Sequence, residues 1–398
     1  MRRRLRGMRS GLLCGLVLAG AMAAEAQTLV WSIRLETVGW VDPYKQTPPM
    51  TKQAPQRSAS DNSVGIMESM ARSVQYDPDL GVAYSQMLAI DPAGQVYFGF
   101  GVKGDGPDAA KTFHVVTLDG QHGAVVRRMA MPTPALDRTA VLLAGDGSLL
   151  VVAGDRVQQV KNDGTIGNSI SIPPQPDINP GLWVKQSPSG KTLLLTTDEK
   201  TFQFVRADTL ATVAECRTEN DEVDELNDNL GLSMEDTKGP YFELHSGPFC
   251  GQMRLLWTLS SGRSSSVHLL DDGTVLEVGS QVVRRLTSAD KALWHWKAPG
   301  ETVPEDKGGA AAISRNGGRM AVRLTGFRML RSPGCMECTG PEFEDWNVAI
   351  VVLDLATGRQ VASLPLEHNN ESRLAFALSP NGKRLAVMRG GVLEMWAL

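Results

Sequence analysis

Short apolar runs alternate with turns of small and polar residues along most of this chain. Six of these turns end in glycine and lie between two apolar runs, as at residues 373–378 (RLAFAL) and 385–388 (LAVM). Glycine supplies the positive φ that tight hairpin turns require. The pattern therefore predicts β-hairpins around six turns, at residues 91–94, 144–147, 187–190, 271–273, 314–317 and 379–382.

The spacing of these turns indicates a repeat. Their glycines are 53, 43, 83, 44 and 65 residues apart. The interval of 83 is close to two short intervals, which predicts a degenerate unit near residues 220–262, and the interval of 65 is one unit with an insertion at residues 326–346. Units of about 40 to 45 residues with four short strands are typical of propeller blades. We therefore predict an all-β fold, a β-propeller of about seven four-stranded blades at residues 77–398.

The two ends of the chain are expected to meet in the last blade. Residues 392–396 form its third strand, and no further strand follows before Leu398. The unassigned strand within residues 27–36 (TLVWSIRL at 28–35) can supply the missing outer strand and close the ring. We read residues 37–76 as a linker, in which residues 67–74 can form a short helix.

Several blade segments resemble those of bacterial WD-repeat-like, TolB-like and quinoprotein-like propellers. They are residues 186–195 (QSPSGKTLLL), 313–322 (ISRNGGRMAV), 354–359 (DLATGR) and 378–387 (LSPNGKRLAV). The resemblance covers most of residues 77–398 and implies the fold without implying an activity. The chain departs from WD repeats because Ala397, not Asp, follows Trp396, and because the Gly-His dipeptide does not recur.

The first residues predict export. Five arginines within residues 2–9 precede an apolar stretch at residues 11–24, and Ala24 and Ala26 fit a cleavage site of small residues. This order is typical of a secretory signal peptide at residues 1–26, so we expect a periplasmic or extracellular mature chain. An uncleaved anchor is the alternative, but the apolar run is shorter than the about 20 residues that span a bilayer.

Charge narrows the range of partners. The formal net charge is −4, and loss of residues 1–26 removes five arginines and Glu25, which leaves −8 on the mature chain. No cluster of Lys and Arg follows Arg9, so neither nucleic acid nor an anionic membrane is expected as a partner. We expect a monomer without a membrane span that binds a protein or a small ligand on a propeller face.

Four cysteines remain after the expected cleavage. An even number in an oxidising compartment indicates disulfides, and we predict the pairs Cys335 with Cys338 and Cys216 with Cys250. A redox pair and a four-cysteine zinc site are the alternatives. The first usually lies at a helix N-terminus and the second usually has two Cys-x-x-Cys motifs.

An acidic segment is the strongest compositional anomaly. Eight carboxylates and no Lys or Arg occur at residues 219–236, and Asp221, Asp224 and Asp228 are candidate ligands for calcium, the one cofactor considered. The alternative is a solvated loop between blades three and four. Catalytic motifs such as Gly-x-Ser-x-Gly and His-Glu-x-x-His are absent from the sequence, so we name no catalytic residue.

The repeat register suggests one further site. Positions nine residues before the turn glycines include Arg138 and Arg373, which are expected near the central channel with Lys307 nearby. These three cations could attract an anion, or the arginines could pair with acids of neighbouring loops. We favour a non-catalytic binding module that uses the loops leading into each blade. The alternative is a hydrolase or lactonase-like enzyme with a metal at the channel.

Overall fold

The computed structural model describes fifteen parts of the chain. The expected signal peptide and most of the expected linker lie outside them. The described residues are 27–40, 87–103, 110–134, 136–172, 184–198, 201–217, 223, 225–236, 241–252, 254–260, 266–279, 281–305, 312–330, 342–366 and 374–398.

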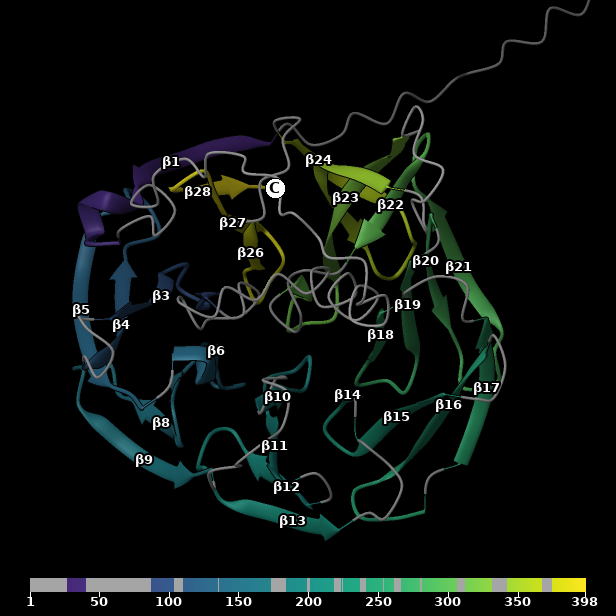
Figure 1. Cartoon of the computed structure of the whole chain (residues 1–398), viewed down its shortest axis with the longest axis horizontal. Coiled ribbons are helices and arrows are strands. Elements are labelled where there is room, and N and C mark those ends of the chain that lie inside the picture. The colour runs from purple at the N-terminus through teal and green to yellow at the C-terminus, as the bar shows by residue number, and fades with distance from the viewer. Residues whose placement is uncertain are drawn as a thin grey trace, which may run out of the picture.

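Seven four-stranded antiparallel sheets are arranged around a ring, as predicted (Figure 1). Blades 1 to 6 are β2–β5, β6–β9, β10–β13, β14–β17, β18–β21 and β22–β25, and blade 7 is β26–β28 with β1. The innermost strands are β2 (Leu88–Ile90), β6 (Thr139–Leu143), β10 (Val184–Gln186), β14 (Glu225–Leu226), β18 (Ser266–Leu269), β22 (Thr302–Glu305) and β26 (Ala375–Leu378). The second strands are β3 (Val96–Lys103), β7 (Leu149–Ala153), β11 (Thr192–Asp198), β15 (Leu230–Asp236), β19 (Val275–Gly279), β23 (Arg319–Leu330) and β27 (Arg384–Arg389).

The outer half of each blade lies toward the circumference of the ring. The third strands are β4 (Lys111–Leu118), β8 (Arg156–Val160), β12 (Thr201–Arg206), β16 (Tyr241–Pro248), β20 (Val282–Leu286), β24 (Glu342–Asp354) and β28 (Val392–Ala397). The outermost strands are β5 (Val125–Pro132), β9 (Ile166–Ser171), β13 (Thr212–Arg217), β17 (Arg254–Ser260), β21 (Ala292–Lys297), β25 (Gln360–Pro365) and β1 (Thr28–Arg34). The short 3-10 helices η1 (Leu35–Val38) and η3 (Leu136–Arg138) follow β1 and precede β6.

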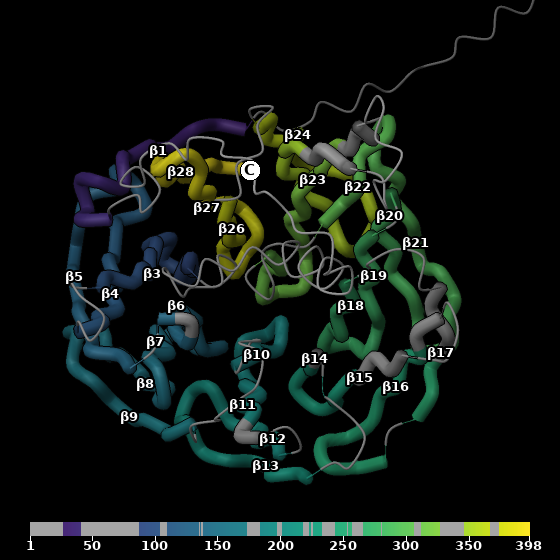
Figure 2. The backbone as a smooth tube through the Cα atoms, viewed as in Figure 1, coloured from purple at the N-terminus to yellow at the C-terminus, as the bar shows by residue number. Residues whose placement is uncertain are grey.

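The N-terminal strand closes the ring, which confirms the prediction. β1 pairs antiparallel with β28, from Thr28 opposite Ala397 to Arg34 opposite Val392. Figure 2 shows this segment, in purple, beside the yellow C-terminal blade. η1 continues to blade 1, where Arg128 donates a 2.6 Å hydrogen bond to the carbonyl of Val38. The ends of the chain therefore join blades 7 and 1.

The strand order gives the ring two different faces. In each blade the chain runs outward through four antiparallel strands, so the first and third turns lie on one face, which we call the turn face. The second turns and the segments between blades lie on the other face, which we call the loop face. Glycines with positive φ end most of the first turns, for example Gly147 at φ +89°.

Two irregular blades match the irregular spacing of the turns. Blade 4 occupies residues 225–260 and is the unit predicted without a turn glycine. In blade 6 the described part of the expected insertion at residues 326–346 continues the hairpin of β23 and β24, with Gly326 opposite Trp346. Cys335 and Cys338 lie outside the described residues.

The apolar core runs between the blades. The largest cluster joins blades 7, 1 and 2 through buried side chains such as Met388, Phe98 and Val141. Blades 6 and 7 share a second cluster around Val352 and Phe376, because neither sheet can cover its own faces. In the part of the chain that the structure describes, no helix has the length and apolar character needed to cross a membrane.

Candidate functional site

An irregularity repeats near the start of every outermost strand. Each of these strands carries an extra residue opposite the third strand, a β-bulge just after the chain leaves the turn face. The bulge directs the residue that follows it toward the next blade. Among the described side chains, these residues are Trp31, Arg127, Asn168, Ala214, Trp294 and Ala362.

Large side chains at this position fasten neighbouring blades together. Trp294 of blade 5 lies over Gly358 of blade 6, and its Nε1 donates to the carbonyl of Leu355 at 2.8 Å. The ring of Trp31 in blade 7 also covers a turn glycine of the next blade, Gly123 of blade 1. In blade 1, Arg127 donates to the carbonyl of Lys161 in blade 2 at 3.0 Å. At these places the side chain fills the gap over the next blade's third turn.

In blade 3 the corresponding residue is the small Ala214, and in blade 6 it is likewise an alanine, Ala362. Phe249, from the third turn of blade 4, packs back toward it, and its ring stacks on Phe204 with centroids 3.9 Å apart. A disulfide between Cys216 and Cys250 joins the same two blades, with Cα atoms 5.0 Å apart. Because alanine is small, the space above blade 3 stays open.

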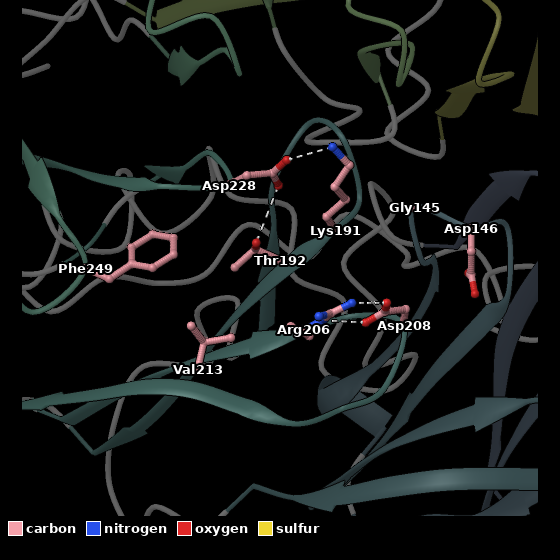
Figure 3. A pocket seen from close by; sticks show the side chains of 9 residues that line it. All are labelled: Gly145, Asp146, Lys191, Thr192, Arg206, Asp208, Val213, Asp228 and Phe249. Atoms are coloured by element: carbon pink, nitrogen blue, oxygen red, sulfur yellow. Dashed lines mark hydrogen bonds and ion pairs between the residues drawn. The ribbon is translucent and has the colours of Figure 1, made fainter.

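This space is a pocket of about 460 Å³ on the turn face, bounded by blades 2, 3 and 4. In Figure 3 the ring of Phe249 and the carboxylate of Asp146 lie at opposite ends of the pocket, with two ion pairs between them. The volume is within the range of about 300–1,000 Å³ common for ligand sites. The lining residues are Gly145, Asp146, Lys191, Thr192, Arg206, Asp208, Val213, Asp228 and Phe249.

Asp228 is the most firmly held group of the pocket. Its Oδ1 accepts hydrogen bonds from the hydroxyls of Ser187 at 2.9 Å, Ser189 at 2.6 Å and, at 3.4 Å, Thr192. Its Oδ2 lies 3.4 Å from Nζ of Lys191, whose side chain is 72% exposed. The carboxylate is therefore fixed by the first turn of blade 3, whereas its cation is held only loosely.

A second ion pair lies at the outer side of the pocket. Arg206 donates to both carboxylate oxygens of Asp208, at 3.0 and 2.5 Å. This two-point hydrogen bond lowers the pKa of Asp208 below its ordinary value. The pair has a defined orientation, although both side chains reach solvent.

Asp271 adds a carboxylate next to the pocket. It lies on the first turn of blade 5 and accepts a hydrogen bond from the main-chain N–H of Asp228. Burial raises the pKa of Asp271 to about 6, and the negative charge of Asp228 is the second cause of this rise. The positive charge of Lys191 acts in the opposite direction. Part of the Asp271 side chain reaches solvent. Two carboxylates thus lie close together beside one loosely held ammonium group.

Of the candidate residues predicted from the sequence, the structure places one in the pocket and one away from it, and four lie outside the described residues. Asp228 lines the pocket, whereas Arg138 ends η3 on the loop face, away from it. Lys307, Arg373, Asp221 and Asp224 lie outside the described residues. Of the predicted disulfides, the structure describes Cys216 with Cys250. Among the described side chains, no group of three or more His, Cys, Asp or Glu is placed to hold a metal ion.

The other pocket residues were not singled out from the sequence. Lys191, Arg206, Asp208, Val213 and Phe249 come from turns and strand ends that look like ordinary blade sequence. The available signal is the small Ala214 at a position that blades 1, 5 and 7 fill with Arg or Trp. That signal is visible only once the bulges have been aligned.

Comparison with known proteins gives matches among solved structures. No family model matches the chain, and no curated protein matches it. A chain of the structure titled "Crystal Structure of Mitotic Checkpoint Complex" has a TM-score of 0.46 and 10% sequence identity, over 81% of this chain and 89% of that one. The C-terminal WD40 domain of Sif2 has a TM-score of 0.42 and 12% identity, over 79% and 97%.

Proposed function

We propose that this chain is an exported, non-catalytic propeller that binds a protein or peptide partner on its turn face, at the pocket above blade 3. The observation that carries the proposal is the open pocket between blades 2, 3 and 4, whose carboxylates are already held by hydrogen bonds. A preformed site loses little conformational freedom when its ligand binds.

The polar groups of the pocket support binding rather than chemistry. The Asp228 carboxylate is engaged by three hydroxyls and Lys191, and Asp208 is engaged by Arg206 at both oxygens. Asp146 accepts hydrogen bonds from the N–H and hydroxyl of Ser148. Groups held in this way orient a ligand, whereas a nucleophile or general base needs a lone pair directed at the reacting atom.

The proposed surface differs from the one that we favoured from the sequence. The pocket lies on the turn face, whereas from the sequence we favoured the loops that lead into each blade. Its outer edge is open at Val213, whose side chain is 56% exposed. A partner segment can therefore pass from the circumference over blade 3 toward the channel.

The test blocks the pocket without altering its charges. Val213→Trp places a large ring in the pocket from an exposed strand position. Val126→Trp is the matched control, because Val126 is the equivalent bulge residue of blade 1 and is 57% exposed. Residues 27–398 would be immobilised and panned against a library of random peptides displayed on phage.

Peptides recovered on the wild type are expected to lose binding to Val213→Trp by about tenfold or more and to keep it on Val126→Trp. Near-ultraviolet circular dichroism would confirm that both variants are folded. Recovered peptides that bind Val213→Trp as well as the wild type would place recognition elsewhere and reject the proposal. A library that yields no binder to the wild type would also count against it.

A further inference from the structure

The charges of the pocket are unevenly balanced. Its lining contains the carboxylates of Asp146, Asp208 and Asp228 but only the cations of Lys191 and Arg206. Asp271 adds a fourth carboxylate in contact with Asp228, and Arg315, partly buried and close enough to Asp146 to interact with its charge, adds a third cation. Asp272, beside Asp271, is paired with Arg285 at 2.5 Å. Carboxylates thus outnumber cations around the space that a ligand would enter.

The cation at the centre of the pocket is easily displaced. Nζ of Lys191 is 3.4 Å from Asp228, and its side chain is 72% exposed. An exposed pair of this kind contributes about 0–1 kcal/mol, because solvent screens it and the long side chain loses freedom in it. The carboxylate of Asp228 is only 17% exposed and is held by hydroxyls, so it stays in place when Lys191 moves away.

An aromatic wall accompanies the carboxylates. Phe249 is fixed by its stacking on Phe204 and by the neighbouring disulfide of Cys250, and the rest of its ring lines the pocket. A cation near an aromatic ring is attracted by the ring's quadrupole. An anionic or purely apolar ligand would gain from the ring but would face the excess of carboxylates.

We infer, resting on the proposed binding function, that the pocket above blade 3 binds a positively charged side chain, arginine or lysine, of a protein or peptide partner. Asp228 is the main contact of this side chain, and Phe249 forms the wall beside it. The partner's cation takes the place of Lys191 beside Asp228. The cavity is larger than one side chain, so the backbone next to the basic residue lies over Val213 and the outer strand β13.

Asp271 makes this interaction dependent on pH. A bound cation next to Asp228 favours the charged form of Asp271, so proton loss from Asp271 and binding support each other. The groups that face Asp271 are Asp228, Lys191 and Asp272. Affinity for a basic peptide is therefore expected to rise between about pH 5 and pH 7, with a smaller rise in Asp271→Asn.

The closing experiment uses three peptide pools that differ in one residue. Each pool is random in sequence, free of Lys and Arg, and has Arg, Gln or Glu at its central position. Binding of the labelled pools to residues 27–398 is measured by fluorescence polarisation. The Arg pool is expected to bind at least about tenfold more tightly than the Gln pool, and the Glu pool most weakly.

Two variants at one exposed position test the sign of the charge. Val213→Lys is expected to weaken the Arg pool several-fold and Val213→Glu to strengthen it, because position 213 lines the pocket. Val126→Lys and Val126→Glu are the matched controls at the equivalent exposed position of blade 1 and should change neither affinity. The two charge changes act from solvent-exposed strand positions, so the fold is expected to tolerate them.

The possible failures are distinguishable. Gln or Glu pools that bind as tightly as the Arg pool, and that Val213→Trp still blocks, would overturn the basic ligand and leave the binding function standing. Equal effects of Val213→Lys and Val213→Glu would do the same. Binding of every pool that is insensitive to all Val213 variants would overturn the proposed function itself.

Discussion

Arg315, on the first turn of blade 6, donates a hydrogen bond from Nη1 to the main-chain carbonyl of Ala144 in blade 2, on the far side of the central channel. Its Nη2 donates to the neighbouring carbonyl of Leu143. The two blades are 171 residues apart in the chain at this contact. One side chain therefore joins two non-adjacent blades at the turn face, at the residue that precedes Gly145 of the pocket.

Replacing this arginine should weaken the ring moderately. Burial lowers the pKa of Arg315 to about 10, which still leaves the group charged at neutral pH. The carbonyls of Leu143 and Ala144 each keep another donor, Gln186 and Gly147. We therefore expect Arg315→Met to lower the free energy of unfolding by about 1.5–3 kcal/mol, the usual range for hydrogen bonds of a charged group.

Urea unfolding followed by tryptophan fluorescence would measure this loss. Arg156→Met is the control, because Arg156 is 57% exposed and pairs with Asp155 only at 3.8 Å. If Arg315→Met is as stable as the wild type, the cost of desolvating the guanidinium cancels the free energy gained from its hydrogen bonds.

The contact of Trp294 with the third turn of the next blade predicts a second loss of stability. Trp294 packs on Gly358, where φ is +70°, and donates to Leu355 of the next blade. Trp294→Phe keeps an aromatic ring but removes the donor, so we expect a loss of about 1 kcal/mol. Trp294→Ala also removes the packing and should cost about 2 kcal/mol or more.

The neighbouring residue Leu293 supplies the control for the two Trp294 variants. It is 51% exposed at the bulge itself, so Leu293→Ala should change the free energy of unfolding by less than about 0.5 kcal/mol. Thermal and urea unfolding of the three variants would rank them. Equal stability of Trp294→Phe and Trp294→Ala with the wild type would show that this contact does not hold blades 5 and 6 together.

The ring was predictable from the sequence because it depends on local, repeated features. Turn glycines such as Gly147 and Gly382 mark the hairpins, and the double interval between Gly190 and Gly273 contains blade 4. The pairing of β1 with β28 followed from counting strands. Each of these inferences needed only neighbouring residues and one period.

The pocket was not predictable in the same way. It depends on Ala214, which follows one of the seven bulges, and the bulges are a property of pairing between strands. It also depends on Phe249 folding back from blade 4. Asp228 was noticed for its acidic neighbourhood, but its partners Ser187 and Ser189 come from another blade, so their contact is visible only in three dimensions.

Asp271 predicts how stability changes with pH. Its pKa is raised from 3.8 to about 6, so between these values the folded chain binds more protons at this site than the unfolded chain. Stability contributed by this group therefore rises as pH falls from about 7 to about 4, and is lost as pH rises through 6. Asp271→Asn should flatten this part of the profile and raise stability at pH 7.

Urea midpoints measured at intervals between pH 4 and pH 8 would test this slope. Asp163→Asn is a suitable control, because Asp163 lies on the third turn of blade 2 and hydrogen bonds from Thr165 lower its pKa instead. An Asp271→Asn profile parallel to that of the wild type would show that Asp271 does not titrate in this range.

The disulfide links stability to the compartment that we propose. Cys216 and Cys250 are 34 residues apart, and a loop of this size closed by a disulfide is expected to stabilise the folded chain by about 3–4 kcal/mol. Cys216→Ser with Cys250→Ser should show this loss, and reduction of the wild type should approach it. Because the bond also positions Phe249, the double variant should bind pocket-dependent peptides more weakly.

Export is expected to allow the Cys216–Cys250 disulfide to form and to produce the mature N-terminus. We expect the full chain, expressed in a bacterium, to be recovered outside the cytoplasm with Gln27 as its first residue and with Cys216 and Cys250 oxidised. The same chain without residues 1–26 should stay in the cytoplasm with both thiols reduced. Intact mass before and after alkylation measures both the first residue of the chain and the oxidation of the cysteines, because each free thiol adds the mass of one label. A chain recovered whole in the cytoplasm, or a secreted chain that begins at Met1, would contradict the export proposal while leaving the ring and its pocket unaffected.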